Sequence, residues 1–118
     1  MKSEDTMSTE QTLTHHLQAI PQGVEQIMTD YTEESVLFTQ NGPITGLAGI
    51  SAFFDAFLSG SPPELLAAIR VTRQDIHGEV AYILWHAAPF IPLATDTFVV
   101  REGKIIVQSF AMLAPPTG

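Results

Sequence analysis

The second half of the chain is a succession of short apolar runs separated by tight-turn residues, and this pattern restricts the fold more than any other feature. From residue 66 to 113 the runs are rich in β-branched and aromatic residues. They are separated by His77-Gly78, by a proline-bracketed loop at 89–92 and by Arg101-Glu102-Gly103. Such runs joined by short turns are typical of antiparallel hairpins. The sequence therefore predicts four strands that form a meandering sheet.

A helical pattern precedes these strands. Between residues 13 and 31 the apolar residues recur at intervals of three and four, which is the spacing of one helix face. Pro21 and Gly23 interrupt this stripe, so we expect two short helices that share one buried face. The stripe consists of Leu13, Leu17, Ile20, Val24, Ile27, Met28 and Tyr31, which closes the second helix.

A strand and a third helix are expected between the two patterns. Residues 35–42, SVLFTQNG, combine β-branched and aromatic residues with an Asn-Gly turn signal, and Thr45 stands before an apolar helical stretch at 46–60. Helices followed by a meander predict an α+β fold. The helices are expected to pack on one side of a curved, mixed and mainly antiparallel sheet.

The charge balance excludes several classes of partner. The chain has 13 acidic and 5 basic residues and a formal net charge of −8, so neither nucleic acid nor an anionic membrane is expected to bind it. Its 118 residues are expected to form a single domain, 1–118, in which residues 1–10 are a flexible tail. The chain has no cysteine, and its first residues lack the basic and apolar parts of a signal peptide, which favours a cytoplasmic protein.

Three stretches of the sequence resemble a known superfamily. DYTEESVLF (30–38), GPITGLAGISAFF (42–54) and DTFVVREGKI (96–105) resemble stretches of the nuclear-transport-factor-2-like superfamily, in particular its SnoaL-like and ketosteroid-isomerase-like proteins. The resemblance implies a cone whose concave sheet face and helices enclose a pocket for a small apolar molecule. It also implies a homodimer through the convex sheet face. It names no substrate, because this fold carries enzymes, binding domains and assembly modules.

Asp96, which opens an apolar strand, is the first candidate functional residue. If residues 101–103 form a three-residue turn, Asp96 lies opposite Gln108, and a hairpin symmetrical about Ile91 sets His86 opposite Asp96. One sheet face then holds a carboxylate, an imidazole and an amide among apolar side chains, which is the composition of a small-molecule site. The other members of this face are Tyr82, Leu84, Phe98, Ile106, Phe110 and Met112.

Acid–base chemistry is the function that this face suggests. Burial raises the pKa of a carboxyl group and an imidazole titrates near neutrality, so Asp96 and His86 are the candidate catalytic residues. The resemblance implies that Asp96 matches the aspartic acid that ketosteroid isomerases keep neutral in an apolar site. The base aspartate of those enzymes corresponds to Thr39, and their oxyanion tyrosine falls near His15. Thr39, His15 and Phe54 complete the predicted ligand-binding set.

The opposite face of the same strands predicts a subunit interface. Alternation places Trp85 on the convex face, where a large aromatic side chain is costly to expose. The other residues predicted there are Ile83, Thr97, Val99, Val107 and Ser109. No cofactor is expected, and no metal either, because adjacent helical histidines such as His15 and His16 point about 100° apart.

Two functions remain open. One is an isomerase or cyclase that uses His86 and Asp96 on a small apolar carbonyl compound. The other is a non-catalytic homodimeric domain that binds a small ligand or only assembles. In the second case a His86–Asp96 pair satisfies two polar groups at the end of a hairpin. Whether these residues line a cavity open to solvent distinguishes the two.

Overall fold

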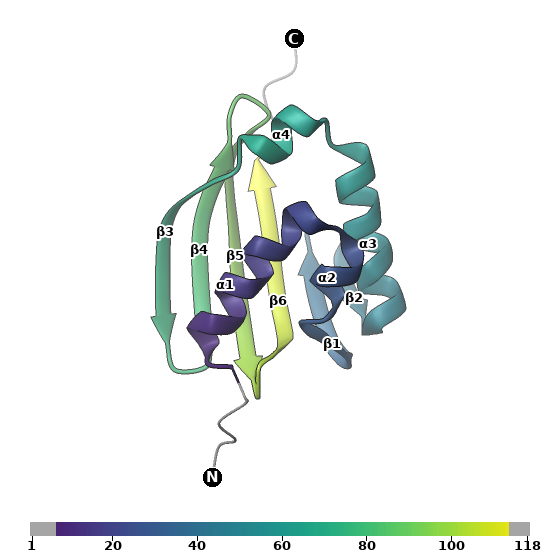
Figure 1. Ribbon diagram of the computed structural model, residues 1–118, viewed down its shortest axis with the longest axis vertical. Coiled ribbons are helices and arrows are strands. Elements are labelled where there is room, and N and C mark those ends of the chain that lie inside the picture. The colour runs from purple at the N-terminus through teal and green to yellow at the C-terminus, as the bar shows by residue number, and fades with distance from the viewer. Residues whose placement is uncertain (1–6, 114–118) are drawn as a thin grey trace.

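The chain forms helices packed on one side of a six-stranded sheet, which confirms the predicted α+β class (Figure 1). The computed structural model describes residues 7–113. Its elements are α1 (Thr9–Ala19), the 3-10 turn η1 (Ile20–Gln22), α2 (Val24–Met28), β1 (Tyr31–Thr39), β2 (Gly42–Thr45), α3 (Gly46–Gly60), α4 (Pro63–Ala67), β3 (Arg70–His77), β4 (Val80–Ala87), β5 (Ile91–Arg101) and β6 (Lys104–Leu113). None of these helices is long and apolar enough to cross a membrane.

A capping box starts α1 inside the segment that the sequence predicts to be a tail. The Ser8 hydroxyl accepts a hydrogen bond from the Gln11 backbone N–H at 3.1 Å, and the Gln11 side chain accepts one from the Ser8 backbone N–H at 2.8 Å. Residues 1–6 of the predicted tail lie outside the described residues. The helix therefore starts at Thr9. The sequence did not predict this start because the segment is polar.

The break between the first two helices falls where the sequence predicts it. Gly23 has a φ of 114°, which favours glycine, and it separates η1 from α2. One residue of the predicted stripe is misplaced: Tyr31 begins β1, because α2 already ends at Met28. Two short elements, β2 and α4, were not predicted at all. Pro63 opens α4 at a position where its missing N–H costs nothing.

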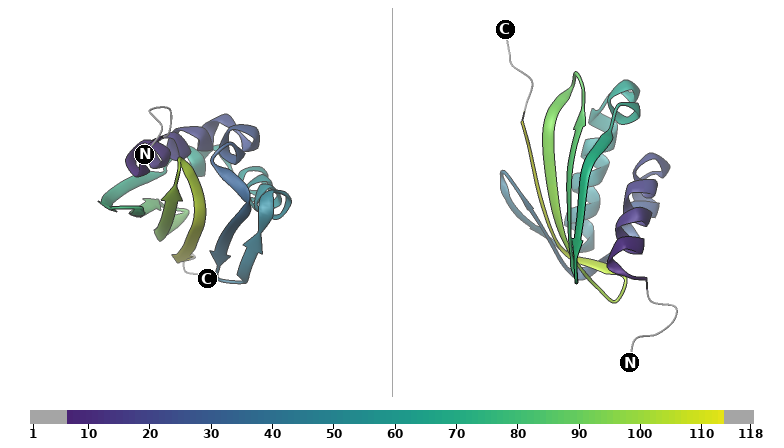
Figure 2. Two further views of the ribbon diagram at one scale, coloured as in Figure 1. Left: turned by 90° about the horizontal axis from the view of Figure 1, so that it is seen from below. Right: turned by 90° about the vertical axis from the view of Figure 1, so that its left-hand side faces the viewer.

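The sheet has the strand order β2-β1-β6-β5-β4-β3, and only β1 and β6 run parallel among the described strands. Figure 2 shows that the sheet is curved and that the helices all lie on one side of it. We call the helix-covered side the inner face and the other side the outer face. The core fills the space between helices and inner face, and its least exposed large side chains include Leu13, Ile27, Leu37, Ile50, Phe98 and Ile105.

The turn between β5 and β6 is shorter than predicted. Glu102 and Gly103 form a two-residue turn in which both residues have positive φ, and a β-bulge follows it. Asp96 consequently pairs with Phe110, so the predicted pairing of Asp96 with Gln108 is wrong by two residues. Because the error is an even number of residues, Asp96 and Gln108 still share one face of the sheet.

His86 does not face Asp96. A register shift between Trp85 and Ala87 changes the β4–β5 pairing, and Asp96 pairs with Ile83. Ile83 and Trp85 therefore lie on the inner face with Asp96, while His86 lies on the outer face. The predicted His86–Asp96 pairing was therefore wrong, and so was the predicted outward position of Trp85 and Ile83. A bulge moves every following side chain to the other face of the sheet, and no residue type in the sequence indicates this bulge.

Candidate functional site

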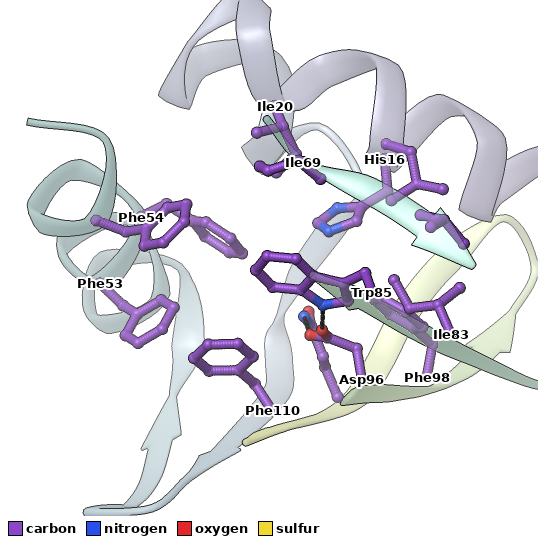
Figure 3. Close-up of a pocket in the computed structure, with 14 residues that line it drawn as sticks. His16, Ile20, Phe53, Phe54, Ile69, Ile83, Trp85, Asp96, Phe98 and Phe110 are labelled. Carbon is purple, nitrogen blue, oxygen red and sulfur yellow. Dashed lines mark hydrogen bonds between the residues drawn. The ribbon is translucent and has the colours of Figure 1, made fainter. Parts of the chain in front are cut away.

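A cavity of about 70 Å³ lies between the inner face of the sheet and helices α1 and α3 (Figure 3). The polar groups in its wall come from three elements: His16 from α1, Asp96 from β5 and Gln108 from β6. The other lining residues are Leu17, Ile20, Phe53, Phe54, Phe57, Ile69, Val71, Ile83, Trp85, Phe98 and Phe110. The wall is thus apolar with a few polar groups, as in many small-molecule sites.

The structure brings five of the predicted site residues together at this cavity. They are Phe54, Asp96, Phe98, Gln108 and Phe110. Four of them share a face because side chains alternate along β5 and β6. The sequence predicted this face correctly, although it predicted the wrong pairing between the two strands.

Three other predicted residues lie on the outer face. Tyr82, Leu84 and His86 alternate with the buried residues of β4 and are half-buried. The Nδ1 atom of His86 is buried and has no hydrogen-bond partner among residues 7–113. None of the three borders the cavity, so a role for them in it finds no geometric support.

The last three predicted residues lie on the inner side of the molecule or at its edge, but outside the cavity. Thr39 ends β1, and its hydroxyl donates a hydrogen bond to the carbonyl oxygen of Gly42 at 2.9 Å. Met112 lies beyond the cavity near the end of β6 and is 37% exposed. His15 precedes His16 on α1 and contacts Asp30 instead of the cavity.

Two residues that line the cavity, His16 and Trp85, were not predicted from the sequence. His16 lies three residues after Leu13 and four before Ile20, so its place on the apolar stripe of α1 was a usable signal. Trp85 offered no comparable signal, because apolar residues occupy both faces of β4.

Asp96 is the centre of a buried hydrogen-bond network. Trp85 Nε1 donates to Asp96 Oδ1 at 2.7 Å, drawn as a dashed line in Figure 3, and Gln108 Nε2 donates to Asp96 Oδ2 at 2.8 Å. The Tyr31 hydroxyl donates to Gln108 Oε1, which fixes the orientation of the amide. The network therefore joins side chains from β1, β4, β5 and β6.

Burial determines the proton affinity of this carboxyl group. Desolvation raises the pKa of Asp96 to about 7, although the hydrogen bonds from Trp85 and Gln108 oppose this shift by favouring the carboxylate. Desolvation also raises the pKa of Tyr31 well above its usual value, with the carboxyl groups of Asp96 and Asp30 adding to the effect. Near neutral pH, Asp96 thus exists in both protonation states, and Tyr31 keeps its proton.

His16 contributes a neutral imidazole to the same cavity. Its ring makes edge-to-face contacts with Tyr31, Phe54 and Phe98, at centroid distances of 6.0, 5.9 and 5.3 Å. Burial, together with repulsion from His15, lowers the pKa of His16 to about 4. Its Nδ1 atom has no hydrogen-bond partner among residues 7–113. The cavity therefore combines a carboxyl group that titrates near neutrality with an uncharged imidazole.

The described part of the chain contains no group of three or more His, Cys, Asp or Glu residues that could hold a metal ion. The side chains of the cavity wall themselves offer acid–base chemistry. Asp96 can accept or donate a proton, and His16 can donate or accept a hydrogen bond.

Comparison with solved structures gives the fold a name. An NTF-2 like protein of unknown function from Burkholderia xenovorans is 18% identical, with a TM-score of 0.71 over 93% of this chain and 86% of that one. A SnoaL-like protein of unknown function from Burkholderia thailandensis is 11% identical, with a TM-score of 0.71 over 90% and 95%. This chain has the NTF2-like fold. A Kribbella flavida protein for which ketosteroid isomerase activity is proposed is 17% identical, with a TM-score of 0.69 over 97% and 86%.

Comparison of the sequence alone finds no relative of this chain. No family model matches the chain, and no curated protein matches it either. At the identities found, the structural neighbours establish the fold, and the chemistry has to be argued from the cavity itself.

We predict that Asp96→Asn changes how stability depends on pH. The carboxyl group titrates near 3.8 in the unfolded chain and near 7 in the folded protein, so the folded state binds the extra proton between these values. The raised pKa therefore lowers the free energy of unfolding as pH rises from about 4 to about 7, by about 4 kcal/mol in total. Asparagine removes this loss. Urea unfolding at several pH values should show the variant gaining stability relative to wild type across this interval.

The half-exposed Asp75, which bonds Arg73 on β3, supplies the matched control Asp75→Asn. Its stability relative to wild type should change little between pH 4 and pH 7. The opposite contribution of His16, whose pKa is lowered, cancels because both proteins contain it. A flat difference between Asp96→Asn and wild type would show that the Asp96 pKa is not raised.

Proposed function

We propose that this protein binds a small, mostly apolar carbonyl compound in the cavity and that Asp96 moves a proton on it, as an isomerase does. The observation that carries the proposal is the position of Asp96: a carboxyl group with a pKa of about 7, buried in the wall of an apolar cavity. A general base works best when its pKa lies near the working pH. An aspartate at the surface, with its pKa near 4, would be a weaker base.

The chemistry needs no group beyond those in the cavity wall. The Asp96 carboxylate takes a proton from the carbon next to the carbonyl. The electron pair of that C–H bond forms a carbon–carbon double bond, and the π pair of the carbonyl group moves onto its oxygen. The neutral His16 imidazole donates its N–H to the resulting oxyanion. In a ketone with a double bond between its β and γ carbons, Asp96 then returns the proton to the γ carbon, the carbonyl re-forms, and the double bond moves next to it, which restores the carboxylate and gives the isomer. Trp85 and Gln108 hold the carboxyl group in place throughout.

The size of the cavity restricts the substrate. Its volume of about 70 Å³ is roughly half that of the ~150 Å³ protein cavity known to hold benzene. Only the reacting end of a ligand fits without movement of the wall. We therefore expect a small cyclic or conjugated ketone and not a steroid nucleus.

The cytoplasmic location of the protein stays a prediction.

The alternative is a ligand-binding domain without catalysis. It is supported by the same hydrogen bonds, because Trp85 and Gln108 already satisfy both oxygens of Asp96. In this alternative the carboxyl group holds β4, β5 and β6 in register and moves no proton.

Deuterium exchange separates the two functions. We predict that the protein accelerates exchange of the protons next to the carbonyl of cyclohexanone and cyclohexenone in D₂O, followed by NMR. Asp96→Asn should lower the rate by about 10²-fold, the usual contribution of a general base, and Asp75→Asn should leave it unchanged. Because the carboxylate is the base, the rate should rise with pH through about 7. Ketones that change Trp85 fluorescence without exchanging would favour the binding domain.

We also propose that two copies associate through the outer face of the sheet. Its half-buried side chains include Tyr82, Leu84, Val99 and Val107, and no described helix covers them. Two chains that each carry a net charge of −8 repel one another, but the outward side chains of β4, β5 and β6 include no acidic residue, and Asp75 lies beside Tyr82 only on the edge strand β3. The outer face is therefore where a second copy meets the least repulsion.

Light scattering at tens of micromolar protein tests this association. We expect twice the mass of one chain for wild type, and the mass of one chain for Leu84→Lys, which puts a charge in the apolar centre. Gln74→Lys makes the same charge change on the exposed edge strand β3 and should stay dimeric. A wild-type monomer at this concentration would exclude the interface.

A further inference from the structure

Asp30 is a buried carboxylate that the proposed chemistry does not use. It lies between α2 and β1, with 1% of its surface exposed. His15 Nδ1 lies 2.8 Å from Asp30 Oδ1 and 3.0 Å from Oδ2. His16 Nδ1 lies 3.9 Å from Asp30 Oδ2. One carboxylate therefore has two imidazoles beside it.

The two histidines reach different environments. They are neighbours on α1 and point about 100° apart. The side chain of His15 is 36% exposed, whereas that of His16 is 4% exposed and lies in the cavity wall. Asp30 thus connects an imidazole in contact with solvent to an imidazole in contact with the cavity.

Other charged or titratable groups near this trio come from β1, β5 and β6. Lys104 on β6 donates a hydrogen bond to the Thr29 carbonyl oxygen at 2.6 Å, and its charge favours the Asp30 carboxylate. Tyr31 on β1 packs its phenol ring against His16 and keeps its proton. Asp96 on β5 lines the same cavity as His16. Burial raises the pKa of Asp30, while His15 and Lys104 act against the rise.

We propose that Asp30 is a positioning residue that, together with His15, sets the charge of His16 and so transmits the protonation of the solvent-exposed imidazole to the cavity. This rests on the proposed function, in which the neutral His16 imidazole donates its N–H to the substrate oxygen. Asp30 attracts a proton to His16, and a protonated His15 repels one. A charge on His15, next to Asp30, therefore keeps His16 neutral.

The coupling is reciprocal and is measurable on the free protein. If the charge of His15 lowers the proton affinity of His16, then a charge on His16 lowers that of His15 by the same factor. The pair therefore titrates as a unit, and removing one member shifts the other. Asp30 acts in the opposite direction from His15, which gives two variants with opposite expected signs.

NMR titration of the four histidine rings tests this proposal. His15→Gln removes the repelling charge and should raise the His16 midpoint, about 4 in wild type, by about one pH unit. Asp30→Asn removes the attracting charge and should lower it, so that His16 no longer titrates above pH 4. His77→Gln, on the exposed strand β3, is the matched control and should leave His16 unchanged.

Two results would overturn the proposal. One is an unchanged His16 midpoint in His15→Gln. The other is a rise in both His15→Gln and Asp30→Asn, because a loosened structure alone moves His16 toward its usual pKa. His15 is partly exposed, so its variant remains informative even if Asp30→Asn does not fold. The titration needs no substrate, so failure of the ketone assay leaves it unaffected.

Discussion

The buried carboxyl group of Asp96 is the constraint on which the inner face of the sheet depends. A carboxyl group in an apolar interior loses its hydration, and this cost is tolerable only if hydrogen-bond donors replace the water or the group keeps its proton. The fold supplies donors from Trp85 and Gln108, with Tyr31 holding Gln108 from the parallel neighbour strand. Burial still dominates, and the result is a carboxyl group poised near neutral pH.

This constraint explains why the strand order matters to the site. Asp96, Trp85 and Gln108 come from adjacent strands, and Tyr31 joins them because β1 lies beside β6. α1 then places His16 over the same face, where the aromatic rings of Tyr31 and Phe98 exclude water. Each polar group at the cavity is thus held by a different element, and the sheet fixes their mutual positions.

The sequence predicted the class of fold and one half of the site. The 3.6-residue and two-residue periods gave the helices and the late strands, and the alternation of β5 and β6 placed Asp96, Phe98 and Gln108 on one face. His86 was wrongly set opposite Asp96, because a single extra residue in the β4–β5 ladder exchanges the faces and depends on long-range packing. Trp85 was predicted on the wrong face of the sheet for the same reason. The NTF2-like fold itself supports several functions, so the proposed function is argued from Asp96 and not from the structural neighbours.

The central claim is that Asp96 is a buried acid with a pKa near neutrality. The most direct measurement is a pH titration of the aspartate side-chain carboxyl carbons by ¹³C NMR, with the Asp96 signal assigned by its loss in Asp96→Asn. The account predicts a midpoint of about 7 for this signal. A midpoint near 3.8, the ordinary value for aspartate, would contradict it and leave the cavity without a general base.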